Sequence, residues 1–243
     1  MDIQPLEHEH GKDAIAERLA GGSKHSYLRD FVYGGIDGAV TTFAVAAGSI
    51  GASLSPRIVL ILGAANLVAD GFSMAASNYL GTRAESDELA RIRAVEARHI
   101  RLEPEGEREE VRQIYAAKGF SGKDLERVVE LVTADQERWI ETMRAEEYGL
   151  PRTIRSPLNA AAVTFAAFAI CGLVPLVPFA LGLDQSFLTA SLLTGMVFFL
   201  VGSAKAKWST MPWWRSGIES LLIGGIAAIL AYVVGMMFGD IFL

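Results

Sequence analysis

Long apolar stretches and one densely charged stretch alternate along this chain. A helix needs about 20 apolar residues to cross the ~30 Å hydrocarbon core of a bilayer, and five segments qualify: roughly 31–53, 57–80, 157–182, 186–204 and 216–239. Between the second and third, residues 86–152 carry 16 Asp and Glu and 12 Lys and Arg. The pattern predicts an all-α protein with five membrane spans and a small helical bundle inserted between spans 2 and 3.

The same pattern divides the chain into four parts. Residues 1–30 form an amino-terminal segment, 31–82 hold spans 1 and 2, 83–152 hold the bundle, and 153–243 hold spans 3 to 5. Most Lys and Arg residues that flank the spans fall on one side: Lys24, Arg29, Arg83, Arg152, Arg155, Lys205, Lys207 and Arg215. Because such residues accumulate on the cytoplasmic side, we expect the amino terminus and the bundle in the cytoplasm and the carboxyl terminus outside.

Composition removes several classes of function. The formal net charge of −6, without a basic stripe, argues against nucleic-acid binding. A single cysteine, Cys171, excludes an intrachain disulfide and a zinc site built on several thiolates. The sequence contains no P-loop, nucleophile elbow or dinucleotide fingerprint. We therefore expect no enzyme activity, no prosthetic group and no ATP-driven step.

Two carboxylates lie within the first two predicted spans. Asp37 is flanked by glycines, and Asp70 shares one helical face with Asn66, Met74 and Asn78. Ionisable groups are costly in lipid and usually face a pathway or a partner. We predict that Asp37, Asp70 and Met74 line a transport path. The alternative is that Asp37 only bonds a neighbouring polar side chain and packs two helices together.

Acids and a histidine recur at helical spacing in the charged stretch. The Glu-x-x-His spacing is one that helical bundles use for iron or manganese sites, and it occurs here as Glu96 and His99. The candidate metal ligands are Glu96, His99, Glu103, Glu107, Glu110, Met143 and Glu147. The alternative is a solvated acidic face that pairs with the arginines of the same stretch.

Three stretches resemble the vacuolar iron transporter family. They are residues 28–38, which contain Leu28-Arg29-Asp30 and Gly34-Gly35-Ile36-Asp37-Gly38; residues 70–80, which contain Asp70-Gly71-Phe72-Ser73-Met74; and residues 172–179. The similarity covers about residues 27–234 and includes the acidic insertion. It implies a homodimer whose ion path, formed by the first two spans of both chains, is lined by Asp37 and Met74.

The resemblance also implies ligands in the bundle. Glu96, Glu107, Glu110 and Glu147 match the family's metal-binding acids, and Met143 matches a thioether. The family's second acid of a Glu-x-x-Glu pair is His99 here, and histidine is a competent ligand for iron(II) or zinc(II).

Together these features predict a proton-coupled antiporter that exports iron(II) from the cytoplasm. Manganese(II) is a second candidate substrate, and zinc(II) a further ion that could bind. The expected partners are transition-metal ions, protons, the lipid bilayer of a bacterial cell membrane and a second copy of the chain. Two alternatives stay open: a membrane-bound di-iron oxidase or iron-storage protein, and a metal-sensing scaffold that binds ions without moving them.

Overall fold

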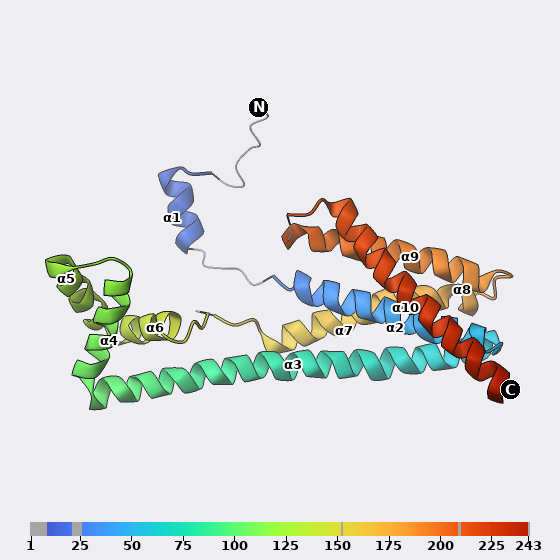
Figure 1. Cartoon of the computed structure of the whole chain (residues 1–243), viewed down its shortest axis with the longest axis horizontal. Helices are drawn as coiled ribbons and strands as arrows, with labels where there is room; N and C mark the ends of the chain where they lie inside the picture. Colours follow the sequence, from blue (N-terminus) through green and yellow to red (C-terminus); the bar gives the residue numbers. More distant parts are fainter. Residues whose placement is uncertain (1–8, 21–25, 152, 209, 243) are drawn as a thin grey trace.

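The computed structural model describes residues 9–20, 26–151, 153–208 and 210–242, and every regular element in these ranges is helical (Figure 1). The α-helices are α1 (Lys12–Ala20), α2 (Leu28–Gly51), α3 (Pro56–Leu102), α4 (Pro104–Ala117), α5 (Gly122–Thr133), α6 (Gln136–Glu146), α7 (Pro157–Leu173), α8 (Val177–Ala180), α9 (Ser186–Lys205) and α10 (Trp213–Phe242). Two short 3-10 helices, η1 (Val174–Leu176) and η2 (Ala206–Trp208), follow α7 and α9.

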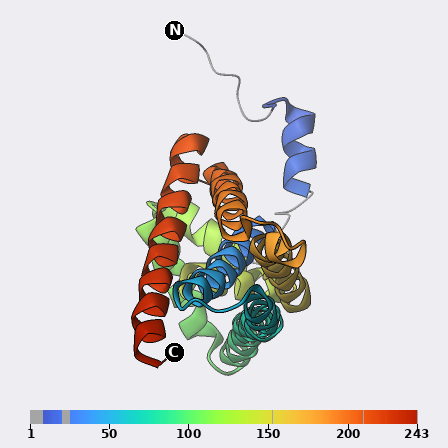
Figure 2. The same cartoon turned by 90° about the vertical axis from the view of Figure 1, so that its right-hand side faces the viewer.

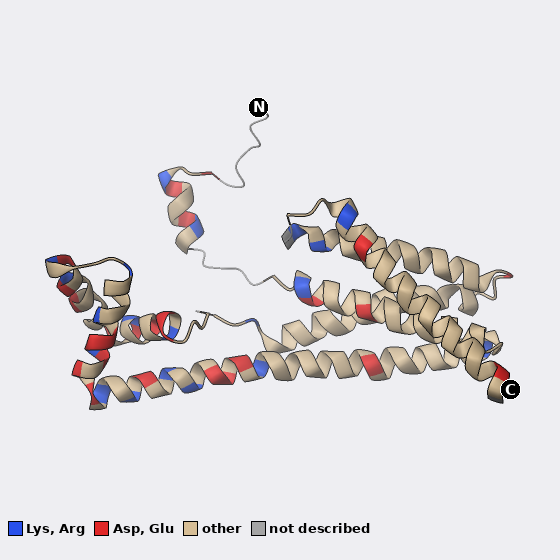
Figure 3. Ribbon diagram, viewed as in Figure 1, with Lys and Arg blue, Asp and Glu red and all other residues tan. Residues whose placement is uncertain are grey.

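Five helical segments are long and apolar enough to cross a membrane. They are α2, the apolar part of α3, the continuous run Pro157–Ala180, α9 and α10. The prediction of an all-α chain with five spans is therefore confirmed. Figure 3 shows the charged residues concentrated outside these apolar parts, on α4 to α6 and on the half of α3 that approaches them.

The second span continues as a much longer helix. α3 has 47 residues, which is about 70 Å at 1.5 Å per residue and more than twice the ~30 Å of a hydrocarbon core. Pro56 occupies its first turn, where the missing N–H costs nothing. The helix ends at Leu102 because the residue before Pro104 is driven out of helical conformation, and Glu103 has φ −134° and ψ 56°.

α2 lies at the centre of the membrane part. It packs against α3, α7, α9 and α10, and Figure 2 shows it enclosed by these helices with α10 at the outer edge. Its contact with α7 is close because glycines face the α7 backbone. A Cβ on Gly34 would lie 2.4 Å from the carbonyl oxygen of Thr164, and one on Gly38 would lie 2.3 Å from that of Phe168. Small residues of this kind let membrane helices approach closely.

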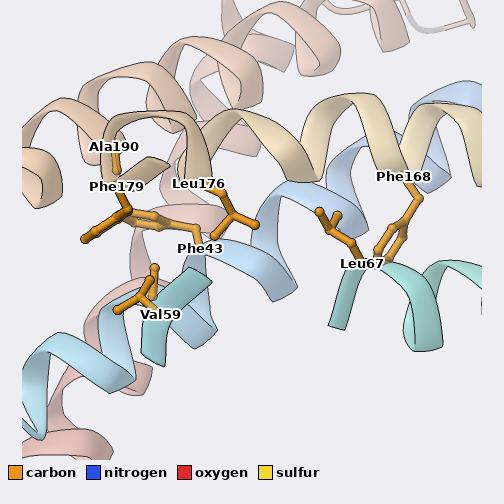
Figure 4. Close-up of a cluster of buried hydrophobic side chains, with 8 residues drawn as sticks. Phe43, Val59, Leu67, Phe168, Leu176, Phe179 and Ala190 are labelled. Atoms are coloured by element: carbon orange, nitrogen blue, oxygen red, sulfur yellow. The ribbon is translucent and has the colours of Figure 1, made fainter. Parts of the chain in front are cut away.

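A cluster of apolar side chains connects α2 and α3 with the third and fourth spans (Figure 4). Its buried members come from α2, α3, α7, η1, α8 and α9: Phe43, Ala46, Val59, Leu67, Phe168, Leu176, Phe179 and Ala190. Since they connect α2 and α3 to the third and fourth spans, the cluster holds the first helical hairpin against the rest of the membrane part.

Helices α4 to α6 and the adjoining end of α3 form the acidic bundle. Its core consists of Val111, Val129, Val132, Trp139 and Met143. The sequence predicts a break over residues 104–106, but the structure interrupts the helix only at Glu103 and starts α4 at Pro104. Pro104 begins α4 instead of breaking the helix, because proline is favourable in the first turn of a helix. The short break places the first turn of α4 beside the last turn of α3.

Candidate functional site

Polar side chains of α2 and α3 meet along one seam. Asn66 Nδ2 donates a hydrogen bond of 3.2 Å to Thr41 Oγ1. One turn further along, Asp37 and Asp70 are close enough for their charges to interact. Two turns beyond, Asn78 Nδ2 donates a bond of 2.9 Å to Asp30 Oδ1. The residues on the predicted polar face of α3 therefore do face α2, turn by turn.

A pocket of about 490 Å³ opens along this seam. Its lining residues are Arg29, Asp30, Tyr33, Asp37, Ser73, Met74, Ser77, Asn78 and Arg155. Two of the three predicted path residues, Asp37 and Met74, thus line one cavity. Asp70 does not line it; it lies one turn from Met74 on α3 and acts on Asp37 through its charge.

Asp37 also lines a second and larger pocket. This pocket has a volume of about 970 Å³ and extends from α2 to Lys205 of α9 and Ile223 of α10. Tyr33, Arg29 and Arg155 line both pockets. Asp37 is therefore the carboxylate that the two cavities share, which places a carboxylate oxygen at their junction.

A buried polar network closes one end of the smaller pocket. Arg155 Nη1 donates to both oxygens of Asp30, at 2.7 and 2.9 Å. Asn78 bonds Asp30 and also donates 2.7 Å to Thr164 Oγ1. We call these four residues the Asp30 network. Sequence reasoning missed it, although an acid and an arginine predicted at the same membrane boundary were a usable signal.

The acidic bundle brings several predicted ligands together. Glu96 is 1% exposed and Glu107 is 5% exposed, although glutamate is rarely buried without a partner. His99 Nδ1 lies 3.2 Å from Glu107 Oε1, and the Tyr148 hydroxyl donates 3.1 Å to Glu96 Oε1. The second oxygen of each buried carboxylate has no hydrogen-bond partner among the described residues. Glu107 and Glu96 are close enough to share a hydrogen bond when Glu107 is protonated, so a proton or a cation can occupy the space between the two carboxyl groups.

The acids of the bundle act on one another. Burial, and then the charges of Glu96, Glu110 and Glu147, raise the pKa of Glu107 to about 7. Burial and the charges of Glu96 and Glu110 likewise raise the pKa of Glu147. Burial and the bond to Glu96 raise the pKa of Tyr148 to about 12. Four predicted ligands therefore form one electrostatic unit, which we call the acidic cluster: Glu96, Glu107, Glu110 and Glu147.

Two predicted ligands lie elsewhere, and one residue was missed. Met143 is fully buried in the apolar core of the bundle, and Glu103 is exposed at the junction of α3 and α4. Tyr148 was not predicted, although it directly follows Glu147. Within the described parts of the chain, no three His, Cys, Asp or Glu side chains are close enough to hold a metal ion. Binding therefore requires the acids to move closer together.

Comparison with known proteins assigns the chain to a family. Residues 28–236 match the VIT family. The chain is 33% identical to the "Vacuolar iron transporter" of Toxoplasma gondii over 97% of its own length and 84% of that protein. It is 32% identical to "Vacuolar iron transporter 1" of Arabidopsis thaliana over 84% of its length and 83% of that protein. These relatives are named as transporters, not enzymes, and the chain belongs to the VIT family.

Proposed function

We propose that this protein carries iron(II) across a membrane in exchange for protons, with manganese(II) as a second substrate. The observation that carries the proposal is the pocket between two apolar spans that both Asp37 and Met74 line. Relatives named vacuolar iron transporters support the choice of metal. In this proposal Asp37 and Met74 hold the ion in passage, and the charge of Asp70 adds to the attraction.

The donor atoms fit a transition metal. Carboxylates alone suit Mg²⁺, Ca²⁺ and Mn²⁺, whereas a thioether favours softer ions. Mg²⁺ also releases its water shell reluctantly. A pocket in which one carboxylate and one thioether face the ion therefore selects iron(II) over magnesium(II).

The acidic cluster supplies the capture step. Because the pKa of Glu107 is about 7, this carboxyl group is partly protonated at neutral pH, and a divalent cation that binds there displaces a proton. Most Lys and Arg residues that flank the predicted spans fall on the same side as the acidic bundle. This bias supports a cytoplasmic position for the bundle. The bundle then collects ions on the side from which they are exported.

A second copy of the chain completes the path in this proposal. Tyr33 of α2 is 69% exposed in the single chain, and it lines both pockets beside Asp37. We place the partner's first two spans against this face, where they would cover the smaller pocket.

Transport into liposomes tests the proposal. The purified chain is reconstituted with an iron(II)-quenched dye and a pH dye, and iron(II), manganese(II), zinc(II) and magnesium(II) are added in turn. We expect iron(II) uptake with opposing proton movement, lost in Asp37→Asn and reduced at least tenfold in Met74→Ala. Asp184→Asn, in the exposed turn before α9, is the matched control and should transport normally.

Two results would contradict the proposal. Unchanged iron(II) flux in Asp37→Asn would show that the ions follow another route. Oxygen consumption on addition of iron(II), without metal entering the liposomes, would instead indicate an iron oxidase.

A further inference from the structure

An ion pair joins the start of the first span to the segment that leaves the acidic bundle. Arg155, which precedes α7, donates to both carboxylate oxygens of Asp30. The Asp30 side chain is 5% exposed and that of Arg155 is 24% exposed. Both residues line the pocket that contains Asp37 and Met74.

The position of the pair places it at one end of that pocket. Asp30 precedes Asp37 by seven residues of one helix, which is about 10 Å. Asn78 follows Met74 by one turn of α3, in the direction of the acidic bundle. The pair therefore lies between the acidic bundle and the carboxylate at the junction of the two pockets.

The charge of Arg155 opposes cation passage unless it is neutralised. A guanidinium stays protonated in proteins, and a positive charge in a weakly screened site repels a divalent cation over this distance. Asp30 offsets the charge, and Asn78 fixes the carboxylate because it also bonds Thr164 of α7. Arg29 also lines this pocket and contributes a positive charge, but the part of the local charge that comes from Arg155 depends on its pairing with Asp30.

We propose that the Asp30–Arg155 pair sets the affinity of the ion path for its cation. Asp30 is a positioning residue that holds and neutralises Arg155, and the balance between the two charges determines how strongly an incoming divalent ion is attracted. This inference rests on the proposed cation transport. It assigns to the two residues a role distinct from the direct contact of Asp37 and Met74 with the ion.

Neutralising each member should shift the KM in opposite directions. Asp30→Asn leaves an unpaired cation beside the path, so we expect the KM for iron(II) to rise about tenfold. Arg155→Gln leaves an unpaired carboxylate, so we expect a KM about tenfold lower together with a lower kcat, since the ion leaves slowly. The double variant Asp30→Asn/Arg155→Gln removes both charges and should return the KM to within about threefold of the unmodified chain. A tenfold change in KM is the size expected when one unit charge acts on a divalent ion over about 10 Å.

A purely structural role would give a different pattern. Both single variants would then lose flux without opposite KM shifts, and the double variant would be no better than either; this result overturns the inference. Arg155→Lys keeps the charge and should keep the KM, which provides a second test if Asp30→Asn does not fold. Asp87→Asn, which breaks the exposed Arg83–Asp87 pair, is the control and should leave the KM unchanged.

The two proposals fail in distinguishable ways. If the unmodified chain moves no iron(II), cation transport itself is wrong. If it moves iron(II) and the single variants retain its KM, only the role of the pair is wrong. Size-exclusion profiles and thermal unfolding of each variant separate misfolding from an altered KM.

Discussion

His99 at the end of α3 faces Glu107 in the first turn of α4, with 3.2 Å between Nδ1 and Oε1. The contact is possible because a single residue, Glu103, separates the two helices. It places an imidazole at the edge of the acidic cluster, beside a carboxyl group whose pKa is raised to about 7. The geometry leads to predictions about proton balance, metal preference and stability.

The acidic bundle should lose stability as the pH rises from about 4.5 to about 7 without metal. The folded state keeps the Glu107 proton in this range while the unfolded state releases it, so unfolding becomes more favourable with increasing pH. The protection factors of residues 92–115 in the full chain, which are the exchange rates corrected for their intrinsic pH dependence, should fall over this interval. Glu107→Gln should flatten the dependence, and an equally steep profile in that variant would assign it to another group.

Replacing His99 by glutamate should change the metal preference of the bundle. A carboxylate favours manganese(II), whereas imidazole suits iron(II) and zinc(II). We expect His99→Glu to weaken zinc(II) binding at least tenfold relative to manganese(II), as measured by competition calorimetry on the full chain. Glu88→Gln, an exposed change on α3, should leave the ratio unaltered. An unaltered ratio in His99→Glu would mean that residue 99 does not contact the ion.

The variant Tyr148→Phe should destabilise the acidic bundle. It removes the donor to Glu96 Oε1 and leaves a buried acceptor unpaired, which costs about 1–3 kcal/mol. Saturating manganese(II) should offset part of the loss, because the ion then interacts with Glu96. Thermal unfolding with and without the ion measures both effects. Equal losses in the two conditions would show that Glu96 is not a ligand.

The close contact of α2 and α7 should not tolerate a methyl group. In Gly38→Ala the new Cβ would lie 2.3 Å from the carbonyl oxygen of Phe168, so the two backbones must separate. We expect a thermal midpoint about 4–8 °C lower, a size typical of a loss of about 2 kcal/mol in a chain of this length. Gly225→Ala on α10 meets nothing within 4 Å and serves as the control. A normal midpoint in Gly38→Ala would indicate that α7 shifts at no cost.

The sequence allowed the prediction of features that depend on periodicity. Length and hydropathy predicted the five spans, and a three- and four-residue spacing placed Asn66, Asp70, Met74 and Asn78 on one face, which the structure directs toward α2. Periodicity could not predict the Asp30–Arg155 pair because it joins residues 125 positions apart; the only signal was that both residues lie at the same predicted membrane boundary. Met143 was predicted as a ligand from helical spacing and from the family resemblance, and spacing alone could not predict that its side chain is also buried in the core of the bundle.

The length of α3 has a consequence for how an ion travels. Glu96 and Met74 belong to the same helix and are 22 residues apart, which fixes their backbones about 33 Å from one another. The stretch between them contains one glycine, Gly81, and no proline, and the helix runs through it without a break. Within one chain, an ion therefore cannot be passed by direct contact from one residue to the other. Under the proposed function the ion would have to dissociate and diffuse, so that the release rate of the bundle, and not only its affinity, would limit delivery.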